Sequence, residues 1–204
     1  MPKKVILIGA GENAQVIKNI LDKKKQYNII GYLDDAKKGK EIIGKIADFK
    51  KYINNSYFFI TICNNKARKK FYNLLEKNSA KFANAVHSKA YLEKNVKIGK
   101  NVFIGAFSYI NVNSKIGDNS FINNCCIIEH DNLIKEHSHL APGVITGGKV
   151  KIGVSSFVGL GVVINDHITI GNNAVIGSGA VVINNIKENS TAVGVPAKII
   201  KLIK

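Results

Sequence analysis

From Val86 onward an aliphatic residue recurs every six positions, without a change of phase. The series runs to Val182 with Thr146 as its polar member, and the next position in phase is Glu188. A period of six fits neither the ~3.6-residue period of an α-helix nor the two-residue alternation of a strand. It is typical of a hexapeptide β-solenoid, a triangular prism in which each hexad forms one side. The pattern predicts a parallel β-helix of about six coils over residues 86–204, with the aliphatic side chains facing the axis.

Other places of the hexad are also restricted. The fifth place is small or aliphatic, with Asn132 as the exception, and we expect Gly or Asn at corners that need a positive φ. Gly143, Gly161 and Gly179 are spaced by eighteen, so they should stack on successive coils. They serve only as corner residues, or they also leave a shallow groove for a long, thin ligand such as a pantetheine arm.

Residues 1–85 follow a different pattern. "KKVILIGAG", "NIIGYLDD" and "SYFFITICNN" have the composition of strands, whereas residues 12–25 and 66–77 have helical spacing. Strands that alternate with helices predict a parallel sheet. We therefore expect two domains, a small Rossmann-like α/β domain over residues 1–85 and the β-helix over residues 86–204.

The segment "GAGENA" between the first strand and the first helix resembles the GxGxxG fingerprint, with Ala14 in the final glycine position. Backbone N–H groups at such a helix start favour an anion. Asp34 and Asp35 follow the second strand, where a carboxylate that contacts ribose or base is expected. The glycines could instead serve only tight packing. Because the domain is short for a dinucleotide, the pattern favours a mononucleotide or nucleotide-sugar site.

Composition narrows the class of protein. No apolar run approaches the ~20 residues that span a bilayer, and the first residues lack the apolar region of a signal peptide, so we expect a cytoplasmic protein. Cys63, Cys125 and Cys126 show no metal-binding spacing and are expected to be reduced. The net charge of +16 favours polyanionic ligands. Nucleic acid is not expected, because base readers rely on Arg and this chain has only Arg68.

The segment "IIEHDNLIKEHSHLAPG" carries three of the five histidines. A carboxylate that accepts the Nδ1 proton of a His leaves Nε2 free as a general base, and both Glu129 and Asp131 flank His130. Neighbours in a straight strand point to opposite faces, so Asp131 reaches the ring only if the chain bends, which Asn132 suggests. One hexad spans ~20 Å. His130 and His139 should therefore lie too far apart to share a ligand within one chain, which indicates a site between subunits of a three-fold assembly.

A zinc site is the alternative use of these histidines, because some hexapeptide solenoids are zinc carbonic anhydrases. The five histidines do not reproduce that pattern well and no cysteine supports it. We expect no metal.

The segments "ILIGAGENAQVI", "GYLDD", "ITICNNKARKK", "NNCCIIEHD", "EHSHLAPG" and "VGVPAK" resemble the bacterial sugar acyltransferases over nearly the whole chain. That family includes UDP-4-amino-sugar N-acetyltransferases of the bacillosamine and perosamine type and sialic acid O-acetyltransferases. The resemblance implies a left-handed β-helix, a homotrimer with active sites between subunits, and direct transfer from acetyl-CoA, without a metal, to the amine of a nucleotide-linked 4-amino-4,6-dideoxy sugar. Sugar O-acetylation is the alternative; a zinc hydratase or a non-catalytic nucleotide-binding scaffold is more distant.

The resemblance also implies roles for single residues. His130 matches the general base and Asp131 the acid that raises its basicity. The positions that match coenzyme contacts are His139, Gly148, Leu160 and Ser178. The positions that match substrate contacts are Gly11, Glu12, Asn13, Asp34, Asp35, Cys63 and Asn123. Asn13 stands where many relatives carry His, and Cys63 and Ser178 stand where Gly is common, so the handling of the acceptor stays open.

Overall fold

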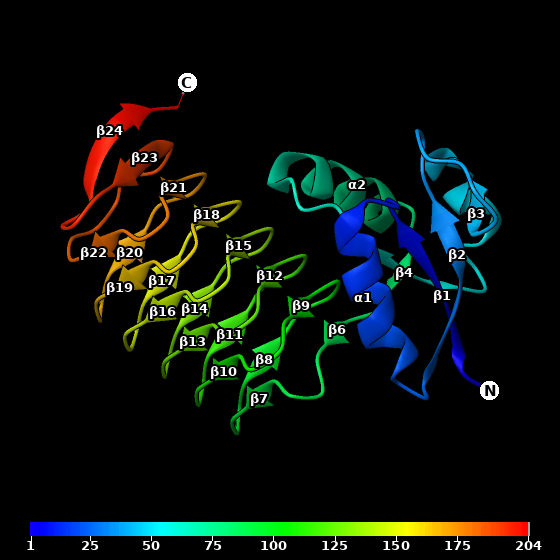
Figure 1. The fold of residues 1–204 in the computed structure, drawn as a ribbon, viewed down its shortest axis with the longest axis horizontal. Coiled ribbons are helices and arrows are strands. Elements are labelled where there is room, and N and C mark those ends of the chain that lie inside the picture. The colour runs from blue at the N-terminus through cyan, green and yellow to red at the C-terminus, as the bar shows by residue number, and fades with distance from the viewer. Residues whose placement is uncertain (204) are drawn as a thin grey trace. The chain divides into compact units, whose positions relative to one another are not determined.

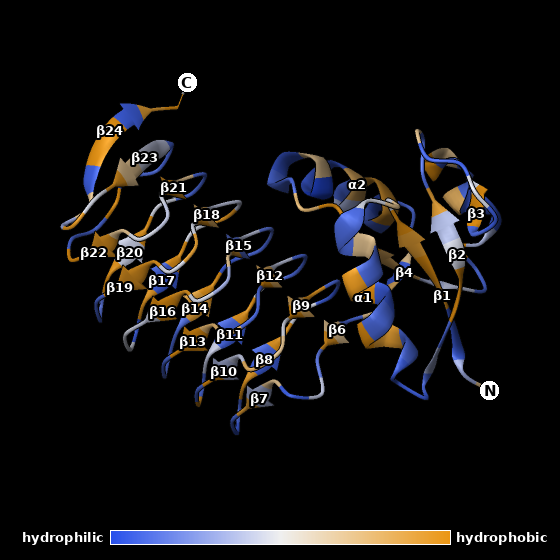
Figure 2. Ribbon diagram, viewed as in Figure 1, coloured by the Kyte–Doolittle hydropathy of each residue, from blue (hydrophilic) through white to orange (hydrophobic). Residues whose placement is uncertain are grey.

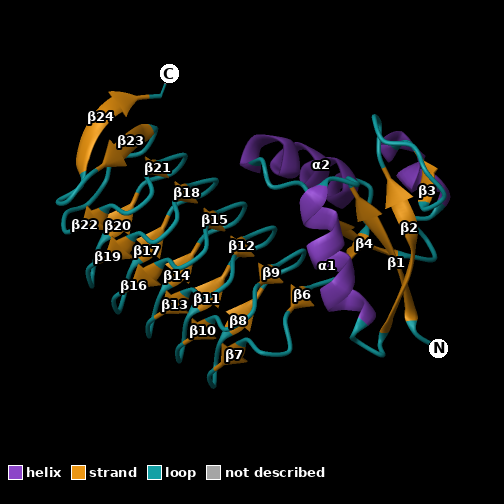
Figure 3. Ribbon diagram, viewed as in Figure 1, coloured by secondary structure: helices purple, strands orange, loops and turns teal. Residues whose placement is uncertain are grey.

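The computed structural model describes residues 1–203 and divides into two compact units, Met1–Ala85 and a second unit that begins at Val86 (Figure 1). The first unit combines helices with a sheet, whereas the second consists of short strands and turns (Figure 3). Within residues 1–203, no helix has the length and apolar character needed to cross a membrane.

The first unit contains a five-stranded sheet in which all neighbouring strands are parallel, as the alternating pattern predicted. Its strand order is β3 (Ile42–Gly44), β2 (Tyr27–Leu33), β1 (Lys3–Ile8), β4 (Tyr57–Ile60) and β5 (Lys81–Phe82). Helix α1 (Glu12–Asp22) joins β1 to β2, a 3₁₀-helix η1 (Ile46–Lys51) precedes β4, and α2 (Asn65–Lys77) joins β4 to β5. The order changes direction at β1, so the carboxyl ends of β1 and β4 form the switch point at which ligands bind in open α/β sheets.

Helix α1 is shorter than the spacing predicted. It ends at Asp22 rather than at residue 25, because the N–H of Lys24 turns back to the carbonyl of Leu21 and β2 begins at Tyr27. Ile17 and Leu21 are fully buried against the sheet, as expected. Val16, which also has core spacing, is exposed instead.

The second unit is a prism built mainly of two-residue strands in three sheets, all parallel except for the last strand of the third sheet. The first sheet contains β7 (Tyr91–Leu92), β10 (Tyr109–Ile110), β13 (Ile127–Ile128), β16 (Ile145–Thr146), β19 (Val163–Ile164) and β22 (Val181–Val182). The second contains β8 (Lys97–Ile98), β11 (Lys115–Ile116), β14 (Leu133–Ile134), β17 (Lys151–Ile152) and β20 (Thr169–Ile170). The third contains β6 (Ala85–Val86), β9 (Phe103–Ile104), β12 (Phe121–Ile122), β15 (His139–Leu140), β18 (Phe157–Val158), β21 (Val175–Ile176), β23 (Ser190–Val193) and β24 (Lys198–Leu202).

The second residue of each short strand faces the axis, and these residues build the core of the prism. Figure 2 shows the strands as a largely hydrophobic series separated by polar turns. The phase predicted from the sequence holds to Val182 and is wrong at Glu188, which is exposed. Ile186 takes the axial place instead and pairs with Ile170, sixteen residues earlier, because the last coil is two residues shorter. The antiparallel strand β24 then ends the sheet.

The three outer faces of the prism differ in chemistry. The first sheet presents an apolar face made by Tyr91, Tyr109, Ile127, Ile145, Val163 and Val181. The second presents a lysine face made by Lys97, Lys115, Leu133, Lys151 and Thr169. The third presents an aromatic face made by Phe103, Phe121, His139, Phe157 and Val175.

The corners of the prism are residues with positive φ at every sixth position. The base corner, between the apolar and lysine faces, consists of Asn95, Asn113, Asp131, Lys149 and His167. The glycine corner, between the aromatic and apolar faces, consists of Phe107, Cys125, Gly143, Gly161 and Gly179. The asparagine corner, between the lysine and aromatic faces, consists of Asn101, Asn119, His137, Ser155 and Asn173.

Candidate functional site

The first unit has a cavity of about 730 Å³ at the carboxyl ends of β1, β2 and β4. This volume lies in the range of sites that hold a nucleotide-sized ligand. The cavity brings together the residues of this unit that the sequence singled out, which are Gly11, Glu12, Asn13, Asp34, Asp35 and Cys63. Exposed Val16 lines it too, which explains why this apolar residue is outside the core.

Gly11 is the N-cap of α1 and has no side chain to satisfy the first N–H groups of the helix. Such groups and the helix dipole favour an anion at this point. The amide of Asn13 is held by the carbonyl of Thr61 at 3.0 Å, so it is fixed at the end of β4. The loop therefore has the geometry of a phosphate site.

Asp34 and Asp35 differ in how their carboxylates are used. Asp34 accepts hydrogen bonds from the N–H groups of Ala10, Ala36 and Lys37 at 2.7–2.8 Å. Burial opposes its charged form, but these backbone bonds outweigh burial and lower the pKa of Asp34. Asp34 thus clamps the glycine loop to the loop after β2, whereas Asp35 is exposed and accepts one bond, from Ile46 N–H at 3.0 Å.

Arg68 organises the loop that carries Cys63, a role that sequence reasoning missed. Its guanidinium is fully buried, and Nη1 donates to the carbonyls of Ile62 at 3.2 Å and Cys63 at 2.8 Å. Burial lowers the pKa of Arg68 to about 9. A lone arginine that follows an apolar strand by a few residues was the available signal.

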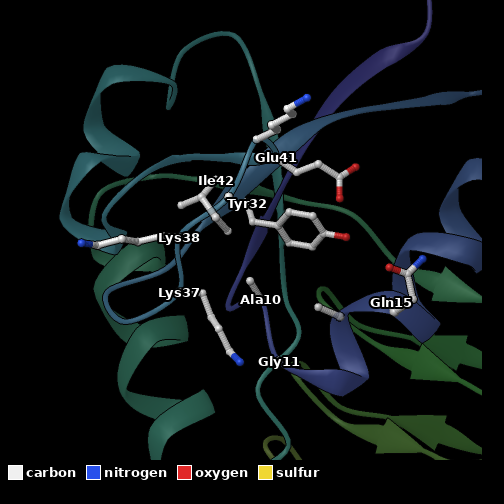
Figure 4. A pocket seen from close by; sticks show the side chains of 11 residues that line it. Ala10, Gly11, Gln15, Tyr32, Lys37, Lys38, Glu41 and Ile42 are labelled. Atoms are coloured by element: carbon white, nitrogen blue, oxygen red, sulfur yellow. The ribbon is translucent and has the colours of Figure 1, made fainter.

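A smaller cavity of about 280 Å³ shares Gly11 with the first one (Figure 4). It lies between the start of α1 and the loop from β2 to β3, and its lining includes Tyr32, Lys37, Lys38 and Lys40. In Figure 4 the Lys37 side chain lies toward Gly11. The lysines place positive charge beside the same helix start, which strengthens its preference for an anion.

On the second unit, the base corner confirms that the chain bends at Asp131, which has φ +58°. The bend brings Asp131 Oδ2 to 2.9 Å from His130 Nδ1. Glu129 is not the partner of the ring, because its carboxylate accepts from Asn111 Nδ2 at 2.7 Å. Both members of the pair are open to solvent, with exposed side-chain fractions of 47% for His130 and 41% for Asp131.

Neighbouring coils hold this pair from both sides. Asn113 Nδ2, one coil earlier, donates to Asp131 Oδ1 at 3.2 Å. The bond to His130, followed by the bond from Asn113, lowers the pKa of Asp131. Gly148, one coil later, lies against the imidazole: a Cβ there would be 2.6 Å from His130 Nε2 and Cε1. The carboxylate is therefore kept charged, and the ring occupies space that only a glycine leaves open.

The other predicted residues of this unit lie at a different corner or on a different face of the prism from His130. Asn123, Leu160 and Ser178 lie beside the glycine corner, and Ser178 Oγ accepts from Leu160 N–H at 3.2 Å. His139 lies on the aromatic face with only 7% exposure, between the rings of Phe121 and Phe157. A single chain thus does not bring His130 together with these residues.

The remaining candidate groups have structural surroundings. His137 is buried at the asparagine corner, with Nδ1 2.8 Å from Asn119 Nδ2. Burial raises the pKa of Cys126 to about 12, so its thiol is not ionised at neutral pH and is no nucleophile. Among residues 1–203, no cluster of three or more His, Cys, Asp or Glu could hold a metal ion.

Solved structures of bacterial sugar acetyltransferases are similar to this chain over nearly its whole length. A mutant of perosamine N-acetyltransferase from Caulobacter crescentus, in complex with CoA and GDP-perosamine, is 27% identical, with 97% of each chain covered and a TM-score of 0.93. WeeI from Acinetobacter baumannii is 25% identical, with 97% of this chain and 100% of that chain covered and a TM-score of 0.85. The acetyltransferase domain of PglB from Neisseria gonorrhoeae, in complex with acetyl coenzyme A, is 24% identical. The match covers 98% of this chain and 100% of that chain and supports the fold with a TM-score of 0.94.

Residues 4–75 of the chain match the family described as the PglD N-terminal domain. The resemblance inferred from the sequence is confirmed, and so are the Rossmann-like α/β unit, the left-handed β-helix and the class of enzyme. No curated protein matches the sequence.

Proposed function

We propose that this protein transfers the acetyl group of acetyl-CoA to the amine of a nucleotide-linked 4-amino-4,6-dideoxy sugar, with His130 as general base and without a metal. The observation that carries the proposal is the His130–Asp131 pair. Its 2.9 Å contact occupies Nδ1 and leaves Nε2 for the acceptor. The perosamine N-acetyltransferase that the chain resembles holds CoA and a GDP-linked sugar, which supports the same two classes of ligand here.

In the first unit, the nucleotide end of the acceptor would be bound at the cavity beside Gly11. The helix start and the lysines next to it favour the diphosphate, and exposed Asp35 is better placed than Asp34 to accept from ribose or base. Both UDP and GDP suit these contacts, because backbone N–H groups and ammonium groups read phosphate and not the base.

The reaction would be a direct transfer. The amine attacks the thioester carbon, Nε2 of His130 takes a proton from the amine, the C–S bond breaks, and the CoA thiolate leaves and is protonated by the imidazolium. Asp131 stabilises the imidazolium that forms. The buried Cys126 plays no part, which agrees with transfer without an acyl-enzyme.

The assembly that completes the site would be a homotrimer. Most of the apolar face is exposed, with Tyr91 at 60%, Ile145 at 39% and Val163 at 36%, whereas Tyr109 and Val181 are half-buried. It is bounded by the base corner on one side and the glycine corner on the other. Rotation about a three-fold axis that packs these faces places the base corner of one chain beside the glycine corner of the next. His130 of one chain would then meet Asn123, Leu160 and Ser178 of its neighbour, and the bare glycine corner would hold the pantetheine arm.

The test is release of free thiol from acetyl-CoA with UDP- and GDP-linked 4-amino sugars, their 4-hydroxy analogues and free sialic acid. We expect thiol release with a nucleotide-linked amino sugar and none with the hydroxyl analogues. Turnover of only hydroxyl acceptors would instead establish O-acetylation. Absence of turnover in the whole panel, with nucleotide bound, would establish a binding scaffold.

A further inference from the structure

Two polar residues interrupt the apolar interior of the prism. All axial residues from Val86 to Val182 are aliphatic except Thr146. Thr146 is fully buried. Asn132 occupies a fifth place that elsewhere is small or aliphatic, and it is 1% exposed. Within residues 1–203 the Oδ1 atom of Asn132 is buried without a hydrogen-bond partner. Neither choice follows from the demands of the repeat.

Both residues bind the same turn. Asn132 Nδ2 donates to the carbonyls of Glu129 at 2.6 Å and His130 at 3.3 Å, and also to that of Gly147 at 2.9 Å on the next coil. Thr146 Oγ1 accepts from Glu129 N–H at 3.3 Å. The turn that carries the imidazole is therefore held from inside at three backbone groups.

The corresponding turns are held differently. The N–H of Asn111, in the equivalent place one coil earlier, donates to the main-chain carbonyl of Ile128 at 2.8 Å. In the coil after Glu129, the N–H of Gly147 likewise donates to the main-chain carbonyl of Ile164 at 2.8 Å. Serines in the fifth place donate to the next coil, as Ser120 does to the Lys135 carbonyl at 3.0 Å. Interior serines such as Ser108 and Ser156 also accept from main-chain N–H groups of the next coil. The Glu129–His130 turn differs in that the hydroxyl belongs to an axial residue and takes the place of a main-chain carbonyl, and in that one amide donates to three carbonyls.

We propose that Asn132 and Thr146 form an interior clamp that sets the position of the His130 backbone, and so of Nε2, for the proposed acetyl transfer. They are positioning residues, because they act through the backbone and do not touch the substrates. The proposal rests on His130 as the proposed base. Local departures from a fold's own pattern are expected where function requires them.

The repeat itself supplies the test variants. Thr146→Val restores the axial pattern with a side chain of the same shape. Asn132→Ser restores the fifth-place pattern, and each carbonyl then keeps a donor. Gly147 would receive the serine hydroxyl, Glu129 still receives Ser114 Oγ at 2.8 Å, and His130 still receives Lys149 N–H at 2.9 Å. In Thr146→Val the Glu129 N–H loses its present acceptor, and it can turn instead to the main-chain carbonyl of residue 146, as the N–H groups of Asn111 and Gly147 do at the equivalent places.

Each variant is expected to lower kcat by ~10-fold, since a misplacement of 1 Å at a reacting group can cost ~10²-fold. The KM values for both substrates should stay within about twofold, and Tm should be unchanged or higher, as when a strained functional site is relieved. Ser120→Ala is the control: it removes an interior hydroxyl bond elsewhere in the prism and should lower Tm while kcat is retained. Wild-type kcat in both Asn132→Ser and Thr146→Val, or a loss of kcat matched by an equal loss of folded protein, would overturn the proposal.

A second readout separates this inference from the proposed function. The His130 ring signals in the NMR spectrum of ¹³C-histidine-labelled protein, assigned by their disappearance in His130→Ala, need no substrate. They should shift in Thr146→Val and Asn132→Ser and not in Ser120→Ala. Shifted signals with a fully active His130→Ala would mean that the clamp exists and the assigned base is wrong; unshifted signals would remove the clamp whatever the activity.

Discussion

The base corner and the glycine corner have the same backbone and opposite surfaces. Asp131 and Gly161 both have φ near +60° and occupy the same place in the hexad. At one corner the side chains form a ladder that ends in a His–Asp pair, whereas at the other a Cβ on Gly161 would meet nothing within 4 Å. Positive φ favours Gly, Asn and Asp, although Phe107, Lys149 and Ser155 also adopt it at corners of this prism. The residue chosen at each corner decides whether that corner carries chemistry or leaves space.

The largest expected effect on activity comes from removing the imidazole of His130 beside the base corner. His130→Ala should lower kcat by ~10²–10⁴-fold, the range that general-base catalysis supplies. The exposed ring has few packing contacts to lose, so circular dichroism and Tm should match the wild type. A kcat within threefold of the wild type, measured by thiol release, would assign the base to another residue.

The next largest effect would come from separating the two corners. Ile145→Asp places a charge in the middle of the apolar face and should convert trimers to monomers in sedimentation velocity. Activity should fall by ~10²-fold, because the two substrates are no longer positioned in one site. Lys115→Asp, on the lysine face, is the matched control and should sediment as a trimer. A monomeric, fully active Ile145→Asp would show that one chain contains the whole site.

Charge at the base corner can be tested separately from the ring. Asp131→Asn keeps the shape and tolerates the positive φ, and it removes the charge that stabilises the imidazolium. The maximal rate should fall by ~10-fold, below the full effect of the base. The pKa of Asp131 is lowered by His130 and Asn113, so the wild-type carboxylate is charged at neutral pH. Glu129→Gln, whose carboxylate is bonded to Asn111 and not to the ring, should keep the wild-type rate in the same thiol-release assay.

The glycine corner can be tested by giving it a side chain. Gly161→Asn keeps a residue that tolerates positive φ, as Asn113 and Asn173 do in this fold. The amide would enter the space proposed for the pantetheine arm and should raise KM for acetyl-CoA by ~10-fold, which corresponds to ~1.4 kcal/mol. The KM for the nucleotide sugar should not change. Ser155→Asn, at the asparagine corner with the same φ, should change neither constant, and an equal effect of both variants would remove the groove.

Much of the structure of the prism could be predicted from the sequence, because the six-residue repeat has a fixed phase. The axial residues and the stacked glycines follow from counting in sixes, whereas the bend at Asp131 was suggested by Asn132 in the fifth place. The shortened last coil was marked only by the charged Glu188 in an axial place, and the pairing of Ile186 was needed to show that two residues are missing.

The polar contacts across coils were harder to predict. The Asn113–Asp131 bond joins residues eighteen apart, and reading every eighteenth residue would have placed them together. The structural role of Asp34, which joins two loops, could not be inferred from the sequence. Its partners are backbone N–H groups of loops whose conformation the hydrophobic pattern does not determine. The clamp on His130 was visible only as exceptions, Asn132 and Thr146, whose partners required the structure.

The smallest effect is expected when the base corner is made more like the glycine corner without touching the pair. Asn113→Gly suits the positive φ and removes the donor to Asp131 Oδ1. That bond is exposed and 3.2 Å long, so its loss should lower kcat by only about twofold. Asn95→Gly, one coil further away, removes the 3.4 Å bond to Asn113 and should leave kcat at the wild-type value. Because both variants add the same backbone freedom to the same corner, a larger loss from Asn113→Gly than from Asn95→Gly isolates the contact with the carboxylate. Equal losses would mean that the stiffness of the backbone, rather than the hydrogen bonds between side chains, fixes the geometry of the His130–Asp131 pair.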